Sequence, residues 1–243
     1  MRSTLLSAHG LIHGFSQTAD GNIDFRYGPA PEVTANHAAF LRSLEIDPAE
    51  GVMMRVEGKD SIAVVDADAK GRGMRSLDDA VVADGLVTSA RRVCLLLAVA
   101  DCLPIILFDP AGRLALVHAG WKGTDLRIVQ KAVRLLKERF GVRPDGLVAH
   151  IGPGIGAASY RFRDPIQRQL PDWAPYLEDL ASGETAIDLA GFNRQQLVEA
   201  GVPAGNIETS DVDTASDPNY FSHYRVERSG ETEGRFMAAV MLP

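Results

Sequence analysis

Cysteine and long apolar runs are both scarce in this chain of 243 residues. Its two cysteines, Cys94 and Cys102, lie eight residues apart in one apolar run, which is too far along a strand for a disulfide. No apolar stretch approaches the ~20 residues that a membrane-spanning helix needs. The run Val93–Ala100 is far too short, and Asp101 interrupts it. These shortages exclude a disulfide framework and a transmembrane protein.

A basic excess and an export signal are missing as well. The 32 acidic residues outnumber the 25 basic ones, and the net charge of −7 argues against a general nucleic-acid binder. The start of the chain carries one positive charge and only a brief apolar patch, whereas a secretory signal requires an apolar core of ~7–15 residues. We therefore expect a cytoplasmic monomer with two free thiols and with no nucleic-acid or membrane partner.

Strand-like and helix-like segments interleave without a regular βαβ rhythm, and no internal repeat is present. This pattern predicts an α+β fold with mixed sheets, in a single domain that spans residues 1–243. The segments expected to be helical are Glu32–Leu44, Thr124–Phe140, Asp164–Leu180 and Phe192–Ala200. Those expected to be strands include Val52–Val56, Ser61–Val65, Leu147–Ile151, Ile207–Val212 and Phe236–Leu242.

The most informative segment is 100–123, which reads ADCLPIILFDPAGRLALVHAGWKG. Two apolar runs, Leu95–Phe108 and Leu114–Val117, predict buried strands joined by the turn Asp109–Gly112. Cys102 lies in the first run and His118 ends the second. Because a hairpin brings residues near its open end together, the thiol and the imidazole should share one pocket. This is either half of a zinc site or a Cys/His catalytic pair.

Each of these residues also has an ordinary structural interpretation. A lone cysteine in an apolar strand is more often inert core, and we accept that for Cys94. Cys102 differs because Asp101 precedes it and Pro104 follows, and both are unusual in a buried strand. Glu57 stands in a turn at a strand end, where it is either a ligand reaching the pocket or a solvated carboxylate.

The clearest helix, Thr124–Phe140, follows the pocket directly. Thr124 is a plausible N-cap and Gly141 a plausible terminator. Because this helix begins just after Trp121-Lys122-Gly123, its free backbone amides should point toward His118, with Lys122 beside them as a second anion-binding group.

The sequences ADCLP and VHAGWKG resemble the YfiH-like family, also called laccase-domain or polyphenol-oxidase-like proteins. Three further stretches match in order: His13–Ser16, the glycine turn Ile151–Gly156 leading to Tyr160, and the tail Tyr220–Arg225 with Gly234 and Arg235. The resemblance runs from about residue 11 to the C-terminus. It implies a mixed β-sandwich with flanking helices.

Members of this family are known as zinc-dependent purine nucleoside phosphorylases. The resemblance therefore implies cleavage of adenosine or inosine by phosphate to base and ribose 1-phosphate, with a related adenosine deamination. It implies a zinc ion held by Glu57, Cys102 and His118, with Asp101 as supporting residue or base beside Cys102 and His118. The candidate substrate-binding residues are Asn36, Lys122, Tyr160, His223, Arg225 and Arg235.

The sequence departs from the family pattern at its charged positions. Glu57 stands where the family has a ligand histidine, and arginines are replaced by Thr18, His37 and Tyr224. Two alternatives therefore stay open: an impaired paralogue that binds a nucleoside or a protein partner, and a metal-free hydrolase with Cys102 as nucleophile. Copper-dependent phenol oxidation is disfavoured, because only one of the six histidines has a ligand-like setting.

Overall fold

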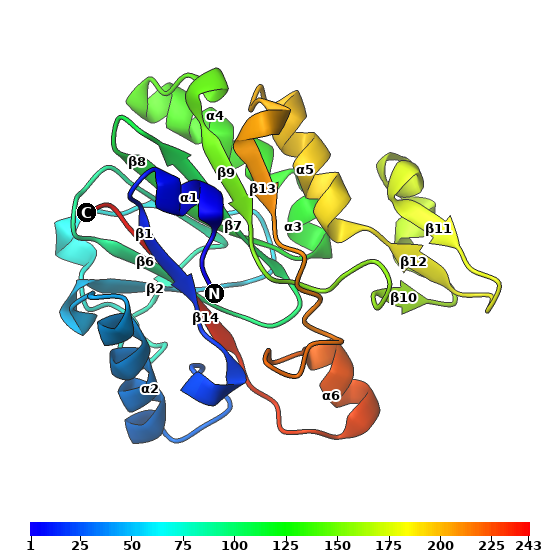
Figure 1. Cartoon of the computed structure of the whole chain (residues 1–243), viewed down its shortest axis with the longest axis horizontal. Helices are drawn as coiled ribbons and strands as arrows, with labels where there is room; N and C mark the ends of the chain where they lie inside the picture. Colours follow the sequence, from blue (N-terminus) through cyan, green and yellow to red (C-terminus); the bar gives the residue numbers. More distant parts are fainter.

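The computed structural model describes residues 1–243 and consists of two large β-sheets stacked face to face between outer helices (Figure 1). The five-stranded sheet has the order β1 (Ile12–Phe15), β14 (Phe236–Met241), β6 (Cys94–Val99), β2 (Gly51–Arg55), β4 (Val81–Val82). The six-stranded sheet has the order β13 (Ile207–Thr209), β9 (Val148–Ile151), β7 (Leu103–Asp109), β8 (Arg113–Ala119), β5 (Gly85–Thr88), β3 (Ile62–Val64). The helices are α1 (Thr4–Ala8), α2 (Ala30–Ser43), α3 (Trp121–Asp125), α4 (Ile128–Phe140), α5 (Leu189–Glu199) and α6 (His223–Ser229).

The central strands are apolar on both faces because each strand packs into a core between the two sheets on one side and against the outer helices on the other. In β14, Ala238 and Val240 point into this central core, whereas Met237 and Ala239 point to the opposite face. Strand β7 alternates in the same way between the central core and the layer of helices beyond it. Sheets covered on both faces produce continuous apolar runs rather than alternation, which is what the sequence shows.

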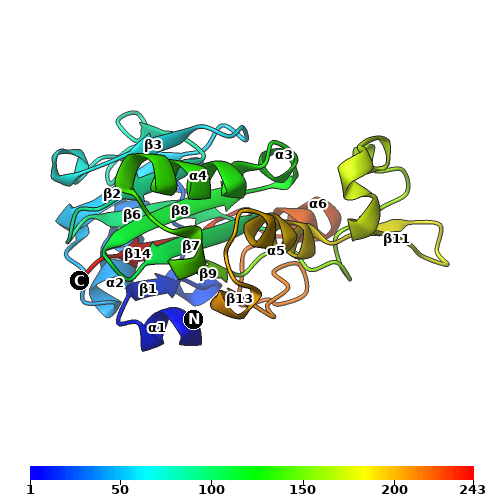
Figure 2. The same cartoon turned by 90° about the horizontal axis from the view of Figure 1, so that it is seen from above.

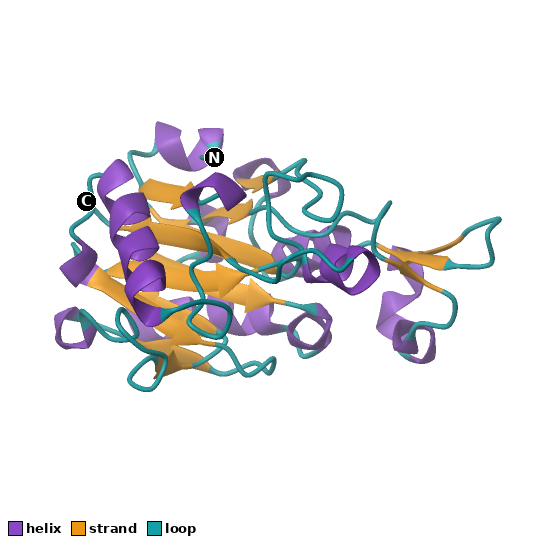
Figure 3. Ribbon diagram, turned by 90° about the horizontal axis from the view of Figure 1, so that it is seen from below, coloured by secondary structure: helices purple, strands orange, loops and turns teal.

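Helices cover the two outer faces of this sandwich (Figure 3). Helix α2 packs on the five-stranded sheet through Phe40 and Leu41. Helices α4 and α5 pack on the six-stranded sheet, where Val129, Val133 and Leu136 of α4 join the outer core. The predicted α+β class with mixed, sandwich-like sheets and flanking helices is confirmed. No helix is both long and apolar enough to cross a membrane.

A third, small sheet projects from the body of the protein (Figures 1 and 2). It has the order β10 (Arg161–Phe162), β12 (Thr185–Ile187), β11 (Leu177–Asp179). The predicted helix Asp164–Leu180 is wrong, because short 3₁₀ turns and β11 occupy that segment. Pro165, Pro171 and Pro175 interrupt any longer helix there.

The run Leu95–Phe108 is two strands, not one, and this is the most consequential correction. Strand β6 ends at Val99 in the five-stranded sheet, and β7 starts at Leu103 in the six-stranded sheet. Between them Asp101 adopts a left-handed backbone with φ of 69°. Cys94 and Cys102 therefore belong to different surroundings: Cys94 is fully buried, and Cys102 lies partly exposed in the crossover.

The predicted helix Thr124–Phe140 is also divided. Helix α3 ends at Asp125, Arg127 is left-handed with φ of 60°, and α4 begins at Ile128. Thr124 therefore lies inside α3 and is not an N-cap, and Gly120 takes that position without a side-chain cap. The predicted stop at Gly141 is confirmed by its left-handed conformation.

The N-terminal segment is held by a buried polar cluster. The carboxylate of Glu208 accepts hydrogen bonds from the hydroxyl of Ser3 and from the amides of Thr4 and Leu5. His150 is 2% exposed, and its Nδ1 lies 3.2 Å from the same carboxylate. Burial lowers the pKa of His150 to about 4, although attraction to Glu208 opposes this.

Acidification should therefore destabilise the fold through His150. An unfolded histidine takes up a proton near pH 6.5 but the folded one only near pH 4, so stability is lost as the pH falls through this window. The loss should reach about 2–3 kcal/mol at pH 4, at about 1.4 kcal/mol per pH unit. We expect urea unfolding at pH 7 and pH 4.5 to show a smaller pH effect in His150→Gln than in the wild type. An exposed control that forms no ion pair, His9→Gln, should keep the wild-type difference, and an unchanged difference in His150→Gln would contradict this account.

Candidate functional site

Cys102 and His118 come together at the open end of the β7–β8 hairpin. Pro104 pairs with His118 and Leu103 with Ala119, so Cys102, one residue before β7, lies across from Gly120. A Cβ atom placed on Gly120 would lie 2.8 Å from Sγ of Cys102 and 3.7 Å from Cε1 of His118. The missing side chain at Gly120 thus leaves the space in which the thiol and the imidazole meet.

Asp84, which directly precedes β5, supports the imidazole from behind. One carboxylate oxygen lies 3.7 Å from Nδ1 of His118 and accepts the amide of Gly58 at 2.7 Å. The other oxygen is buried without a hydrogen-bond partner. The backbone carbonyl of Asp84 also accepts the amide of His118 at 2.8 Å, so the two residues are fixed to each other twice.

The electrostatics of this group favour a protonated imidazole. Burial alone would lower the pKa of His118, but attraction to Cys102 and to Asp84 outweighs it and raises the pKa to about 9. The pKa of Asp84 is lowered despite its burial, because His118 and the amides of Lys59 and Gly58 stabilise the carboxylate. His118 is 12% exposed and Cys102 is partly exposed, so solvent reaches both.

Glu57 does not join Cys102 and His118. Its side chain is 43% exposed, and its carboxylate pairs with the ammonium of Lys59 at 2.9 Å. Only its backbone contributes, since the Glu57 amide donates to Asp84 at 3.2 Å. Glu57, the expected third zinc ligand, is therefore a solvated carboxylate in a turn.

The side chains present do not fit the expected zinc site. No group of three or more histidine, cysteine, aspartate or glutamate side chains is placed to hold a metal ion. Cys102 and His118 supply two of the donors that a three-ligand zinc site requires, and Glu57 is directed elsewhere.

Asp101 positions neighbouring segments, and both of its carboxylate oxygens accept hydrogen bonds from groups other than the adjacent thiol. Its two carboxylate oxygens accept the hydroxyl of Thr214 and the amide of Tyr224, both at 2.7 Å. Its carbonyl accepts the amide of Ile155 at 2.8 Å. Asp101 therefore fastens the glycine turn and the start of α6 to the crossover, and the expected role as a base is not supported by these contacts.

The six expected substrate-binding residues lie in several different surroundings, with Asn36, His223 and Arg235 close to one another and Arg225 apart from them. Tyr160 lies near the thiol: burial is the main cause that raises its pKa, and the charges of Cys102 and Asp101 add to it. Lys122 lies on α3, with its ammonium 5.6 Å from the ring centre of Trp121.

Asn36, His223 and Arg235 form a cluster of their own. The amide side chain of Asn36 donates to the carbonyl of Asn22 at 2.8 Å, and the side chain of Asn22 accepts the amide of Arg235. The guanidinium of Arg235 and the ring of His223 share the carboxylate of Glu233. The chain brings these three residues together, but their polar groups already have partners within the protein.

Arg225 acts as an internal brace. Its guanidinium donates to the carbonyls of Thr214 at 2.7 Å and Tyr220 at 2.6 Å, and to the carboxylate of Glu231 at 2.9 Å. With these contacts, and two longer ones to nearby carbonyls, it holds the tail loop. The expected role in substrate binding is therefore not supported.

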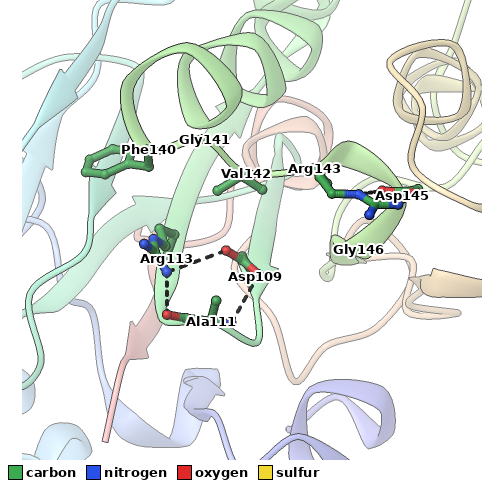
Figure 4. A pocket seen from close by; sticks show the side chains of 9 residues that line it. All are labelled: Asp109, Ala111, Arg113, Phe140, Gly141, Val142, Arg143, Asp145 and Gly146. Atoms are coloured by element: carbon green, nitrogen blue, oxygen red, sulfur yellow. Dashed lines mark hydrogen bonds and ion pairs between the residues drawn. The ribbon is translucent and has the colours of Figure 1, made fainter.

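A separate pocket of about 510 Å³ lies at the far end of the hairpin (Figure 4). The turn that joins β7 to β8 lines it, together with the segment that follows α4. Its charges are paired internally: Arg113 with Asp109 at 4.0 Å and Arg143 with Asp145 at 2.5 Å. This pocket is thus remote from Cys102 along the hairpin, and its charged side chains pair with one another.

Known proteins match this chain over much of its length. The family model described as multi-copper polyphenol oxidoreductase laccase matches residues 12–243. The Bacillus subtilis protein named purine nucleoside phosphorylase YlmD is 36% identical over 181 residues, which are 70% of this chain and 63% of that protein. A protein from an unknown prokaryotic organism, named adenosine deaminase RL5, is 32% identical and matches 96% of this chain and 91% of its own length.

The fold has a solved counterpart as well. The crystal structure of the Bacillus licheniformis hypothetical protein YfiH superposes with a TM-score of 0.88 and 28% identity, over 96% of this chain and 93% of that one. The family match across nearly the whole chain, together with this superposition, leads to one conclusion: the chain belongs to the laccase-domain family that includes YfiH and YlmD.

Proposed function

We propose that this protein is a nucleoside-processing enzyme that cleaves purine nucleosides with phosphate. The observation that carries the proposal is the convergence of Cys102, His118 and Asp84 next to Tyr160. The names of the relatives support the substrate class, since one is called a purine nucleoside phosphorylase and another an adenosine deaminase.

The geometry suits protonation of a departing purine. A phosphate oxygen attacks C1′ of the ribose, and the bond from C1′ to the base breaks with its electron pair moving to the base. His118, protonated at neutral pH, donates a proton to that base. A monohydrogen phosphate loses its own proton in forming ribose 1-phosphate, and this proton restores His118. Asp84 keeps the ring oriented, and Tyr160 offers an aromatic face to the purine.

Zinc has no part in these steps. The resemblance predicts zinc, but the side chains present supply only two of its expected ligands, so the protein's own groups carry the steps given above. Metal analysis of the purified protein tests this prediction separately from activity.

The test is an incubation of the protein with inosine or adenosine, with and without phosphate, followed by chromatography of the products. We expect release of the free base that depends on phosphate and is accompanied by ribose 1-phosphate. Conversion of adenosine to inosine without phosphate would instead identify a deaminase. No reaction with either nucleoside by the folded protein would contradict the proposal.

A second candidate, a metal-free thiol hydrolase, is favoured by one observation. In space, Cys102 adjoins His118 and His118 adjoins Asp84, which suits a nucleophilic thiol, a base and a carboxylate that orients the base. Such an enzyme would form a covalent intermediate on Cys102 and would not need phosphate. Mass spectrometry of the protein quenched during turnover separates the two, because phosphorolysis by direct attack leaves Cys102 unmodified.

A further inference from the structure

A groove of about 470 Å³ is lined by residues of the projecting small sheet and of helix α6. Ser159 leads into β10, Arg161 lies in it, and Glu184 lies just before β12, all on one side of the groove. Residues of α6 form the other side, with Tyr224 and Arg228 among them. The groove therefore depends on segments that are about 60 residues apart in sequence, and the site described above does not use its charges.

Two of the guanidinium groups in this groove carry no ion pair. Arg161 is exposed and its side chain has no polar partner in the protein. Arg228 is exposed and donates only to the carbonyl of Tyr224 at 3.1 Å. Arg225 also lines the groove but is neutralised by Glu231. Two unpaired positive charges thus face one carboxylate, Glu184, and the groove is net positive.

The guanidinium of Arg228 is held in place by aromatic rings. Its central carbon lies 3.4 Å from the ring centre of Tyr224 and 5.9 Å from that of Phe162. The Tyr224 hydroxyl donates to the backbone carbonyl of Arg161 at 3.0 Å, which anchors the ring to strand β10. A stacked guanidinium loses less freedom on binding, and it presents its N–H groups edge-on in the geometry that suits a phosphate.

Contacts through Tyr224 connect the wall of this groove with the surroundings of the thiol. The rings of Tyr224 and Tyr160 are 6.4 Å apart, and the charge of Cys102 acts on Tyr160. The amide of Tyr224 is bonded to Asp101, the residue before Cys102. The family pattern predicts an arginine at position 224. The ring of Tyr224 stands there instead, and it packs against the guanidinium of Arg228, one helical turn later.

We propose that Arg161 and Arg228 form a subsite for a phosphate dianion. The inference rests on the proposed function for the origin of that phosphate, the inorganic phosphate consumed in nucleoside cleavage. A phosphoryl group carried on a nucleotide has the same chemistry, so the test must distinguish the two sources.

The experiment measures binding of inorganic phosphate alone by titration calorimetry, which needs no turnover. We expect Arg161→Gln and Arg228→Gln each to weaken binding about tenfold, as for loss of a charge-assisted hydrogen bond. Arg228→Lys should retain more phosphate binding than Arg228→Gln but less than the wild type, because an ammonium neither stacks nor binds in a bidentate manner. Glu184→Gln should strengthen binding severalfold, since it removes the opposing charge. Arg139→Gln, an exposed arginine of α4, should have no effect.

The outcomes separate this subsite from the proposed activity. Phosphate binding that depends on both arginines, in a protein that does not cleave nucleosides, upholds the subsite and overturns the function. Phosphate-dependent cleavage whose KM for phosphate is unchanged in both variants overturns the subsite. A parallel titration uses inosine 5′-monophosphate. If this nucleotide binds, its binding weakens in both variants, and inorganic phosphate does not bind, the assignment to free phosphate is overturned.

Discussion

Replacing Cys102 with alanine should reduce nucleoside cleavage by about a hundredfold in kcat/KM, at the low end of what general acid catalysis contributes, because it weakens the proton donor His118. The thiol lies beside His118 at the open end of the hairpin, and attraction to Cys102 is among the causes that raise the pKa of His118. Cys102→Ser keeps roughly the size of the side chain but replaces the sulfur, and it should be almost as inactive. Both are measured as initial rates of base release.

Cys94→Ala is the matched control for this prediction. Cys94 is fully buried in the layer between the five-stranded sheet and α2, away from the crossover. Its replacement should lower stability slightly through lost packing and leave kcat/KM within about twofold. Near wild-type activity in Cys102→Ala, in a folded protein, would show that the thiol has no role in the reaction.

Replacing Asp84 with asparagine should lower kcat/KM by about a hundredfold, because the carboxylate orients and charges the catalytic imidazole. It should also move the pH profile. In the wild type, the protonated form of His118 is lost as the pH rises through about 9, so activity should fall there. Without the carboxylate, His118 loses its proton at lower pH, and the alkaline limb should shift down.

The pH shift separates this role from a general loss of structure. In Asp84→Asn the side-chain amide oxygen would still accept the amide of Gly58, so the turn should survive. Asp109→Asn, at the opposite end of the β7–β8 hairpin, is the control and should leave the profile unchanged. A fall in activity in Asp84→Asn with an unshifted alkaline limb would limit Asp84 to a structural role.

The meeting of Cys102 and His118 could be predicted because it follows from hairpin register. The turn Asp109–Gly112 fixes which residues lie opposite each other, and the open end follows by counting along the strands. The division of Leu95–Phe108 between two sheets could not be predicted in this way. Both sheets are covered on both faces, so the apolar pattern continues across the crossover without a break.

Asp84 was missed because its surroundings in sequence are ordinary. It stands in a short loop before an apolar strand, where an aspartate is a common turn residue. Its importance depends on β5 pairing with β8, which places it beside His118, 34 positions later in the chain. A carboxylate at a strand entrance, in a chain with a candidate catalytic histidine, is the signal that could have directed attention to it.

The direction of the Glu57 side chain lay beyond sequence reasoning for a similar reason. Its turn does reach the site, but through backbone amides that bind Asp84. The side chain instead turns outward to Lys59, only two residues away. The position of a residue in a motif therefore predicts where its backbone lies, but it does not predict which partner the side chain binds.

The most direct test of the central claim is a crystal structure of Cys102→Ala with bound inosine. The claim is that Cys102, His118 and Asp84 form one site that acts on a nucleoside. It predicts the purine against Tyr160 and a base nitrogen within hydrogen-bond distance of His118, with the ring still beside Asp84. Inosine bound away from the β7–β8 open end, with His118 turned from Asp84, would contradict it.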